Sequence, residues 1–324
     1  MNVREAVVTA MILAATTLPL AAQSADPPVK ALKVTVLSTM LVGGAGEGVG
    51  EWGFAAVLEA DGRRWLIDTG ARADTVMKNA AELRVDLSDI SDLVITHNHN
   101  DHTGGLLTLR RELSKKNPKA LSRAHVARGI FNSRLDRAGR EGNGLLPIKA
   151  DYEALGGTFV EYAGPARLAP GVWMTGPVPR VHPERNWSVT GQLQTPAGPV
   201  EDNVPEDSSI VVQTPQGLVV VSGCGHAGVI NTVEFARKAV KDEPVHAAIG
   251  GFHLFAASDE TLAWTAGKLK ESRLAYLLGA HCTGIEAVFR LRQALKLPRA
   301  SAVVGAVGAS FTLGKGIDPR PLAQ

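Results

Sequence analysis

The sequence predicts an α/β fold, because short runs typical of β-strands alternate with helical patterns along the chain. No Ser/Pro-rich linker or low-complexity tract interrupts this alternation, so we expect a single domain over residues 26–324. The length of 324 residues and the hydrophobic content of 45% are sufficient for a large buried core. We therefore expect sheets with helices packed on their outer faces.

The strands are predicted where Val, Ile and Leu are concentrated in short runs. Strands that are covered on at least one face have this composition. The predicted strands are residues 32–38, 54–59, 64–67, 92–96, 209–214, 217–222, 245–249 and 274–278.

Three segments show the period of an amphipathic helix. One apolar face is formed by Leu106, Leu109 and Leu113, and another by Ile285, Val288, Phe289 and Leu295. A third helix is expected to begin at Asn231, because Asn is a favoured N-cap and Glu234 would complete a capping box. Residues 143–207 are rich in Pro and Gly, so we expect loops and short hairpins there, near the mouth of the site.

The charge balance argues against a nucleic-acid partner, since 34 Lys and Arg face 32 Asp and Glu. The expected partner is a small-molecule substrate, and the sequence leaves the oligomeric state open.

Residues 1–25 have the pattern of a secretory signal peptide: Arg4, an apolar stretch over residues 6–22, and small residues before Asp26. The apolar stretch is short for a membrane span of about 20 residues, and no later segment is long and apolar enough. We therefore expect a periplasmic or secreted protein without a membrane span in its mature form.

The strongest chemical signal is His97-x-His99-x-Asp101-His102, which follows a predicted strand and precedes a predicted helix. Residues two apart in an extended chain project to the same side, so His97 and His99 can bind one cation while the turn directs Asp101 and His102 toward a second. Imidazole and carboxylate are suitable ligands for zinc or a similar divalent metal.

This motif, together with Asp68-Thr69-Gly70 at the end of an earlier strand, resembles the metallo-β-lactamase superfamily. The resemblance implies a four-layer αββα sandwich with two metal ions at one edge, between the sheets. Further motifs resemble the branch of dihydropterin-ribofuranosyl-aminobenzene-phosphate synthase-like proteins: Glu51-Trp52-Gly53, Thr175-Gly176 through Pro179-Arg180, Gly223-Cys224-Gly225-His226, Gly250-Gly251-Phe252-His253-Leu254 and His281-Cys282-Thr283-Gly284.

The resemblance implies further ligands, because superfamily members complete the two-metal site with a later histidine, a bridging acid or thiol, and a last histidine. At the expected strand end this chain has Cys224 and His226 in place of the usual acid. His226 is expected to bind metal directly, or Cys224 to take the bridging position, or both. His281 is expected to be the last ligand, and the two divalent ions are expected to be zinc, with iron or manganese as alternatives.

Several other residues are expected to support the site. Asp68 would hold the His-rich loop by hydrogen bonds, as in related proteins, and Arg180 would contact an anionic group of the substrate. His253 could be a ligand, a substrate contact or a support for a ligand, against the alternative of a packed histidine. Cys224 and Cys282, the two cysteines, could pair as a disulfide, although the histidine beside each places both near the expected metals.

The expected function is that of an exported metal-dependent hydrolase. A water bridging the two ions would be acidified and would attack an ester, lactone, lactam or phosphoester, with Asp101 orienting it. One alternative is a synthase-like condensation on a pterin-type phosphate substrate, against which export argues because such a precursor is cytosolic. The other is a metal-binding protein without turnover.

Overall fold

The structure is a computed structural model that describes residues 26–136, 138–187 and 191–323. The predicted signal segment, residues 1–25, lies outside the described residues, so export stays a prediction. Within the described part of the chain, no helix combines the length and the apolar character that a membrane crossing needs.

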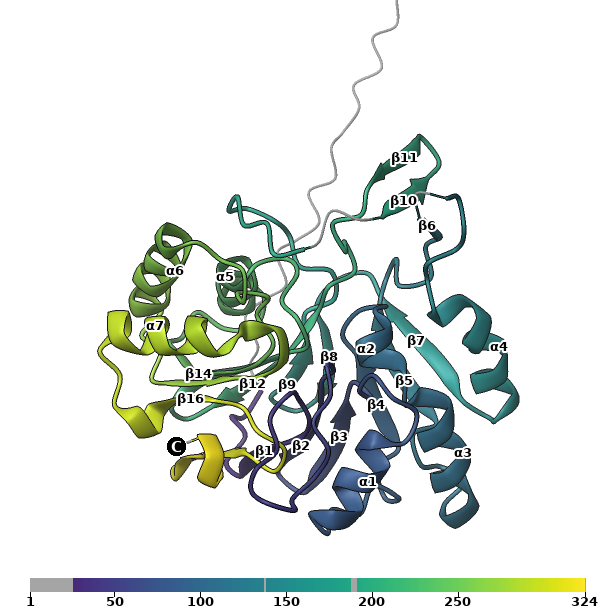
Figure 1. Ribbon diagram of the computed structural model, residues 1–324, viewed down its shortest axis with the longest axis horizontal. Helices are drawn as coiled ribbons and strands as arrows, with labels where there is room; N and C mark the ends of the chain where they lie inside the picture. Colours follow the sequence, from purple (N-terminus) through teal and green to yellow (C-terminus); the bar gives the residue numbers. More distant parts are fainter. Residues whose placement is uncertain (1–25, 137, 188–190, 324) are drawn as a thin grey trace, which may run out of the picture.

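One large sheet is built mainly from the first half of the chain (Figure 1). Its N-terminal strands are antiparallel, and β3, β4, β5 and β7 run parallel. In spatial order its strands are β18 (Gly316–Asp318), β17 (Ser310–Thr312), β1 (Leu32–Ser38), β2 (Ala55–Ala60), β3 (Arg63–Ile67), β4 (Asp92–Ile95), β5 (Arg123–Ala127) and β7 (Thr158–Tyr162).

A second sheet is built from the later part of the chain. Strands β13, β14, β15 and β16 are parallel, and β12 joins them antiparallel. In spatial order its strands are β16 (Ala302–Val304), β15 (Tyr276–Gly279), β14 (Val245–Gly250), β13 (Gly217–Ser222), β12 (Ser209–Thr214), β9 (Val172–Met174) and β8 (Ala166–Ala169). A small separate sheet contains β11 (Gly198–Glu201), β10 (Gln192–Thr195) and β6 (Arg134–Leu135).

Helices cover the outer faces of both large sheets (Figure 1). The first sheet carries α1 (Thr75–Glu82), α3 (Leu106–Lys116) and α4 (Leu145–Ala154), and the short α2 (Asn100–Thr103) follows β4. The second carries α5 (Val229–Ala239), α6 (Asp259–Glu271) and α7 (Ile285–Leu295). Short 3-10 helices lie at His281–Thr283, Arg299–Ser301 and Pro321–Ala323.

Side chains of one strand alternate between the central core and an outer core, as the two-residue period of a strand requires. In β13, Val219 and Val221 enter the core between the sheets, whereas Leu218 and Val220 pack beneath α5 to α7. This arrangement confirms the predicted four-layer αββα sandwich.

Three details of the sequence prediction are wrong. Helix α5 begins at Val229, two residues before Asn231, because the Glu184 carboxylate accepts hydrogen bonds from the first-turn amides of Ile230 (3.1 Å) and Asn231 (2.8 Å). On α7, Ile285 and Phe289 are exposed, and the buried face comprises Ala287, Val288 and Leu291. Residues 143–207, expected to be loops and hairpins, also contain α4 and β7, which extends the first sheet.

The Asp92 carboxylate, at the start of β4, predicts a pH dependence of stability. Burial alone raises its pKa, but hydrogen bonds from His125, Arg123 and Ser91 outweigh burial and hold the pKa below its usual 3.8. An acidic group whose pKa is lower in the folded than in the unfolded state stabilises the protein at pH values above its unfolded-state pKa. This stabilisation is lost as the pH falls toward the folded-state pKa. Between about pH 4 and pH 2, chemical denaturation should therefore show a steeper loss of stability in wild type than in Asp92→Asn; parallel curves would contradict this.

Candidate metal centre

The predicted site residues lie where strands of the two sheets end at one edge. The His-rich turn follows β4, which is parallel to β3, and α2 carries Asp101 and His102. Cys224 and His226 follow β13, His253 follows β14, and His281 follows β15. Because β13, β14 and β15 are parallel, their carboxyl ends meet at the same edge, which brings these turns together.

The side chains form two adjoining groups with the spacing of metal ligands. In each group, the ligand atoms of the three side chains lie within 4.8 Å of one another. One group is His97, His99 and His226, and the other is Asp101, His102 and His281. The structure thus brings all six predicted ligands together.

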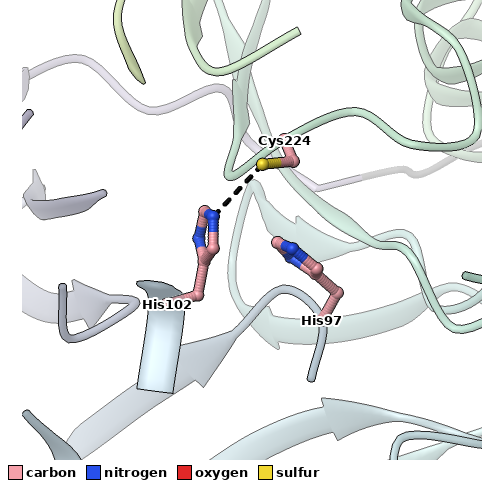
Figure 2. A group of neighbouring side chains, drawn as sticks. All are labelled: His97, His102 and Cys224. Carbon is pink, nitrogen blue, oxygen red and sulfur yellow. Dashed lines mark hydrogen bonds between the residues drawn. The ribbon is translucent and has the colours of Figure 1, made fainter. Parts of the chain in front are cut away.

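Cys224 lies between these groups. Its Sγ is 3.1 Å from His102 Nε2, and it also forms a ligand group with His97 and His102 (Figure 2). Among the described residues, the ligand group that contains His226 is the one with His97 and His99. The geometry therefore places Cys224, rather than His226, at the position between the two groups.

The hydrogen bonds of the histidine rings leave donor atoms suited to a cation. His97 Nδ1 is 3.0 Å from Thr96 Oγ1, and His226 Nδ1 is 2.6 Å from the carbonyl oxygen of Asn186. The Nε2 atoms of His97 and His226 are buried, and neither has a hydrogen-bond partner among the described residues. A buried nitrogen without a hydrogen-bond partner destabilises the fold. A histidine that binds a metal through one ring nitrogen usually donates a hydrogen bond from the other, which orients the ring. These residues therefore fit divalent metal ions.

Asp68 connects the His-rich turn to the end of β3. Its Oδ2 lies 2.7 Å from His102 Nδ1 and accepts a hydrogen bond from Thr96 Oγ1 (2.8 Å), while Oδ1 accepts one from Thr96 N (2.8 Å). The residue is buried and has a φ of 54°, a conformation that few residues other than Gly and Asn adopt. Asp68 thus has the supporting geometry expected from the sequence.

The electrostatics of the two groups differ. Burial is the main cause that holds the pKa of His97 well below its usual value, and the neighbouring histidines act in the same direction. Burial also lowers the pKa of His102, but Asp101 and Asp68 outweigh it and raise that pKa to about 9. His281 Nε2 lies 3.2 Å from the Asp101 carboxylate. The two acids therefore concentrate negative charge around the second group.

Cys224 and Cys282 are both free thiols, and their Sγ atoms are 3.2 Å apart. The amide of His253 donates to Cys282 Sγ (3.3 Å), and these three residues form another group with ligand spacing. The disulfide alternative is therefore not formed in the structure, and His253 lies beside the predicted ligands.

Arg180 does not lie free for a substrate. Its Nη2 donates to the backbone carbonyls of Asn203, Val204 (3.2 Å) and His226 (3.3 Å). The guanidinium thus ties together two loops beside the site, and contact with a substrate anion stays a prediction.

Two supporting residues escaped the sequence reasoning. The backbone carbonyl of Asn186 orients His226, and the buried Glu51 carboxylate accepts hydrogen bonds from the amides of Ala71 (2.9 Å) and Arg72 (3.0 Å). A backbone carbonyl leaves no trace in the residue pattern. Glu51 did stand in a motif, Glu51-Trp52-Gly53, whose charge next to glycine was the available signal.

The two cysteines are expected to differ in their effect on metal binding. Cys224→Ser should lower the metal content of the purified protein, because serine is a poor replacement for a thiolate between two ligand groups. Cys282→Ser should retain more metal, since Cys282 belongs only to the group with Cys224 and His253. Elemental analysis of both variants checks this, and equal losses would contradict the assignment.

Comparison with known proteins identifies the family of this architecture. The sequence model of the "Metallo-beta-lactamase superfamily" matches residues 53–237. A 7,8-dihydropterin-6-methyl-4-(beta-D-ribofuranosyl)-aminobenzene-5'-phosphate synthase from Methanocaldococcus jannaschii is 31% identical over 239 residues, 72% of this chain and 81% of that protein. This likeness agrees with the branch that the motifs indicated. It also corrects the expected reaction: the main expectation of a hydrolase is wrong, because this relative is a synthase, whereas export stays a prediction.

Solved structures show the same fold. A metal-dependent hydrolase of the beta-lactamase superfamily matches with a TM-score of 0.67 and 24% identity, over 86% of this chain and 98% of that one. Zn(2+)-bound PqqB from Methylobacterium extorquens matches with a TM-score of 0.52 and 13% identity, over 86% of this chain and 99% of that one. At these identities the likeness extends to the fold alone.

Proposed function

We propose that this chain, which belongs to the metallo-β-lactamase superfamily, is a metal-dependent enzyme that catalyses a synthase-like condensation on a pterin-type phosphate substrate. The observation that carries the proposal is the 31% identity to the M. jannaschii synthase, which extends over most of both chains. The motifs that supply the clustered side chains lie between Asp68 and His281.

The proposed cofactor is a pair of divalent ions, zinc first, with iron or manganese as alternatives. One ion would be held by His97, His99 and His226, the other by Asp101, His102 and His281, with Cys224 between them. When bound, such ions polarise substrate oxygens and stabilise negative charge on a leaving group.

The chain's own groups would orient the reacting partners. The relative's name describes a product in which a dihydropterin is joined through a methyl carbon to an aminobenzene that bears ribose phosphate. An amine that forms such a bond displaces a leaving group, which departs with the electron pair of its bond to the methyl carbon, and the amine loses its proton to the leaving group or to solvent. Asp101, whose side chain is 21% exposed, would orient the amine. Asp68, fully buried behind His102, would hold that ring in position.

Export was the argument against this reaction. That argument depends on residues 1–25, outside the described residues, whereas the likeness to the synthase covers 72% of the chain. Edman sequencing of the protein purified from cells would show whether the predicted signal segment is removed.

The test is a condensation assay with purified protein. A dihydropterin activated at its 6-methylene carbon is incubated with 4-(β-D-ribofuranosyl)-aminobenzene 5'-phosphate, and the joined product is detected by mass spectrometry. We expect product formation that a chelator abolishes and that added zinc, iron or manganese restores. Metal binding without product would instead support the alternative of a metal-binding protein without turnover.

A further inference from the structure

A pocket of about 610 Å³ lies beside the candidate metal centre. It is enclosed by the loop that contains Asn186 and Trp187, by the turn after β14 with His253 and Phe255, and by Trp264 of α6. Two segments that are far apart in the sequence thus bring the aromatic rings of Trp187, Phe255 and Trp264 to one cavity.

The pocket reaches the candidate metal centre through residues that touch the predicted ligands. The centroid of the His253 ring is 4.6 Å from that of the His226 ring, and the backbone carbonyl oxygen of Asn186 lies 2.6 Å from His226 Nδ1, from which it accepts a hydrogen bond. Along a second path, Phe255 lies 5.6 Å from Trp52, which lies 5.1 Å from His281. The pocket therefore lies beside both groups of the centre, one side chain from His226 through His253 and two from His281 through Phe255 and Trp52.

The aromatic side chains of this region are unusually accessible. Phe255 is 50% exposed, Trp52 is 49% exposed and Trp264 is 37% exposed. Large apolar side chains that gather at the surface beside a polar centre are typical of a ligand site. Phe255 and Trp264 line the pocket, so part of each ring faces the cavity.

Two of the rings are held in place by neighbouring side chains. Trp187 Nε1 donates to Glu201 (2.7 Å), and the Arg185 guanidinium lies 5.0 Å from the ring. Trp264 packs against His182 (5.6 Å between centroids), and His182 is itself 2.8 Å from Glu234. Rings that are ordered in advance lose little freedom when a ligand binds.

The inner end of the pocket also offers a polar contact. His253 Nδ1 is buried and has no hydrogen-bond partner among the described residues. The backbone of His253 has a φ of 48°, a conformation that non-glycine residues rarely adopt. A ligand with a heteroatom on a flat ring could satisfy this nitrogen.

We infer that this pocket is a binding subsite for a planar aromatic ring of the substrate, which stacks on Phe255 and Trp264 and reaches the metal centre past His253. This inference rests on the proposed function only for the source of the ring, which is either the pterin or the aminobenzene. Phe255, Trp264 and His253 would be the residues that select a flat ring.

Isothermal titration calorimetry of the purified full-length protein with its metals tests the subsite, with pterin and 4-aminobenzoate as separate probes. Phe255→Ala and Trp264→Ala should each weaken binding of the same probe by about tenfold, because each removes one stacking face. Trp264→Phe should restore most of the affinity. The matched control is Phe289→Ala, which removes an exposed ring on α7 and should leave the dissociation constant unchanged.

The two probes identify the ring. If pterin binds and the two alanine variants weaken its binding, the subsite is supported and holds the pterin. If 4-aminobenzoate binds and the variants weaken its binding, the subsite is supported and holds the aminobenzene. The inference is overturned if neither probe binds, or if Phe255→Ala and Trp264→Ala bind as wild type does. Because binding is measured without turnover, a failed condensation assay with normal ring binding would reject the proposed reaction and leave the subsite standing.

Discussion

Replacing His97 with alanine is expected to lower activity by about a thousandfold and to reduce the bound metal. His97 is fully buried, lies in two of the ligand groups, and its Nε2 has no hydrogen-bond partner among the described residues. Loss of His97, which belongs to the first group and also to the group with His102 and Cys224, would remove charge stabilisation that bound ions provide, which amounts to several kcal/mol. The measurements are elemental analysis and the rate of the condensation assay.

The control for His97→Ala is His246→Gln. His246 is half-buried on β14 and packs against Tyr276 with 5.2 Å between ring centroids, away from the centre. This variant should keep its metal and its activity. Normal metal content in His97→Ala would show that the clustered rings are not ligands.

Asp68→Ala is expected to lower both stability and metal affinity. Its carboxylate is buried and makes hydrogen bonds to Thr96 and a charge-assisted contact with His102. Removing one partner of a buried ion pair costs about 3–5 kcal/mol. Loss of a group that orients a metal ligand typically weakens metal binding by about 10–100-fold. Denaturant unfolding and competition with a metal-binding dye measure the two effects.

Two variants define the cause of the Asp68 effect. Asp68→Asn keeps the shape and one hydrogen-bond acceptor, so it should lose less stability than Asp68→Ala. Asp151→Ala, at an exposed position on α4, should change neither stability nor metal affinity. If Asp68→Ala unfolds at the same denaturant concentration as wild type, the hydrogen bonds of Asp68 do not stabilise the fold.

The strands were the most predictable part of the fold. β1, β12 and β13 have the predicted bounds, because Val, Ile and Leu are concentrated in them and favour a buried strand. The start of α5 was less predictable. Its first amides are satisfied by Glu184, some 46 residues earlier in the chain, so the local capping pattern at Asn231 was misleading.

The loop-rich interpretation of residues 143–207 found the hairpins β8–β9 and β10–β11 but missed α4 and β7, for a related reason. Helix α4 has a weak apolar stripe, with Leu145 and Tyr152 as its buried residues, and Pro147 lies in its first turn. Such a helix gains its stability from packing on the first sheet, which local periodicity does not report.

The sequence by itself determined the four-residue quartet from His97 to His102, because ligands that are close along one strand-to-helix turn are close in space in any fold. It also determined the family, through motifs that are local. Only the tertiary structure decided that Cys224 lies between the two groups, 122 residues from its contact with His102, and that Asn186 orients His226. The packing of two sheets sets these distances, and the same packing builds the aromatic pocket from segments that the sequence keeps apart.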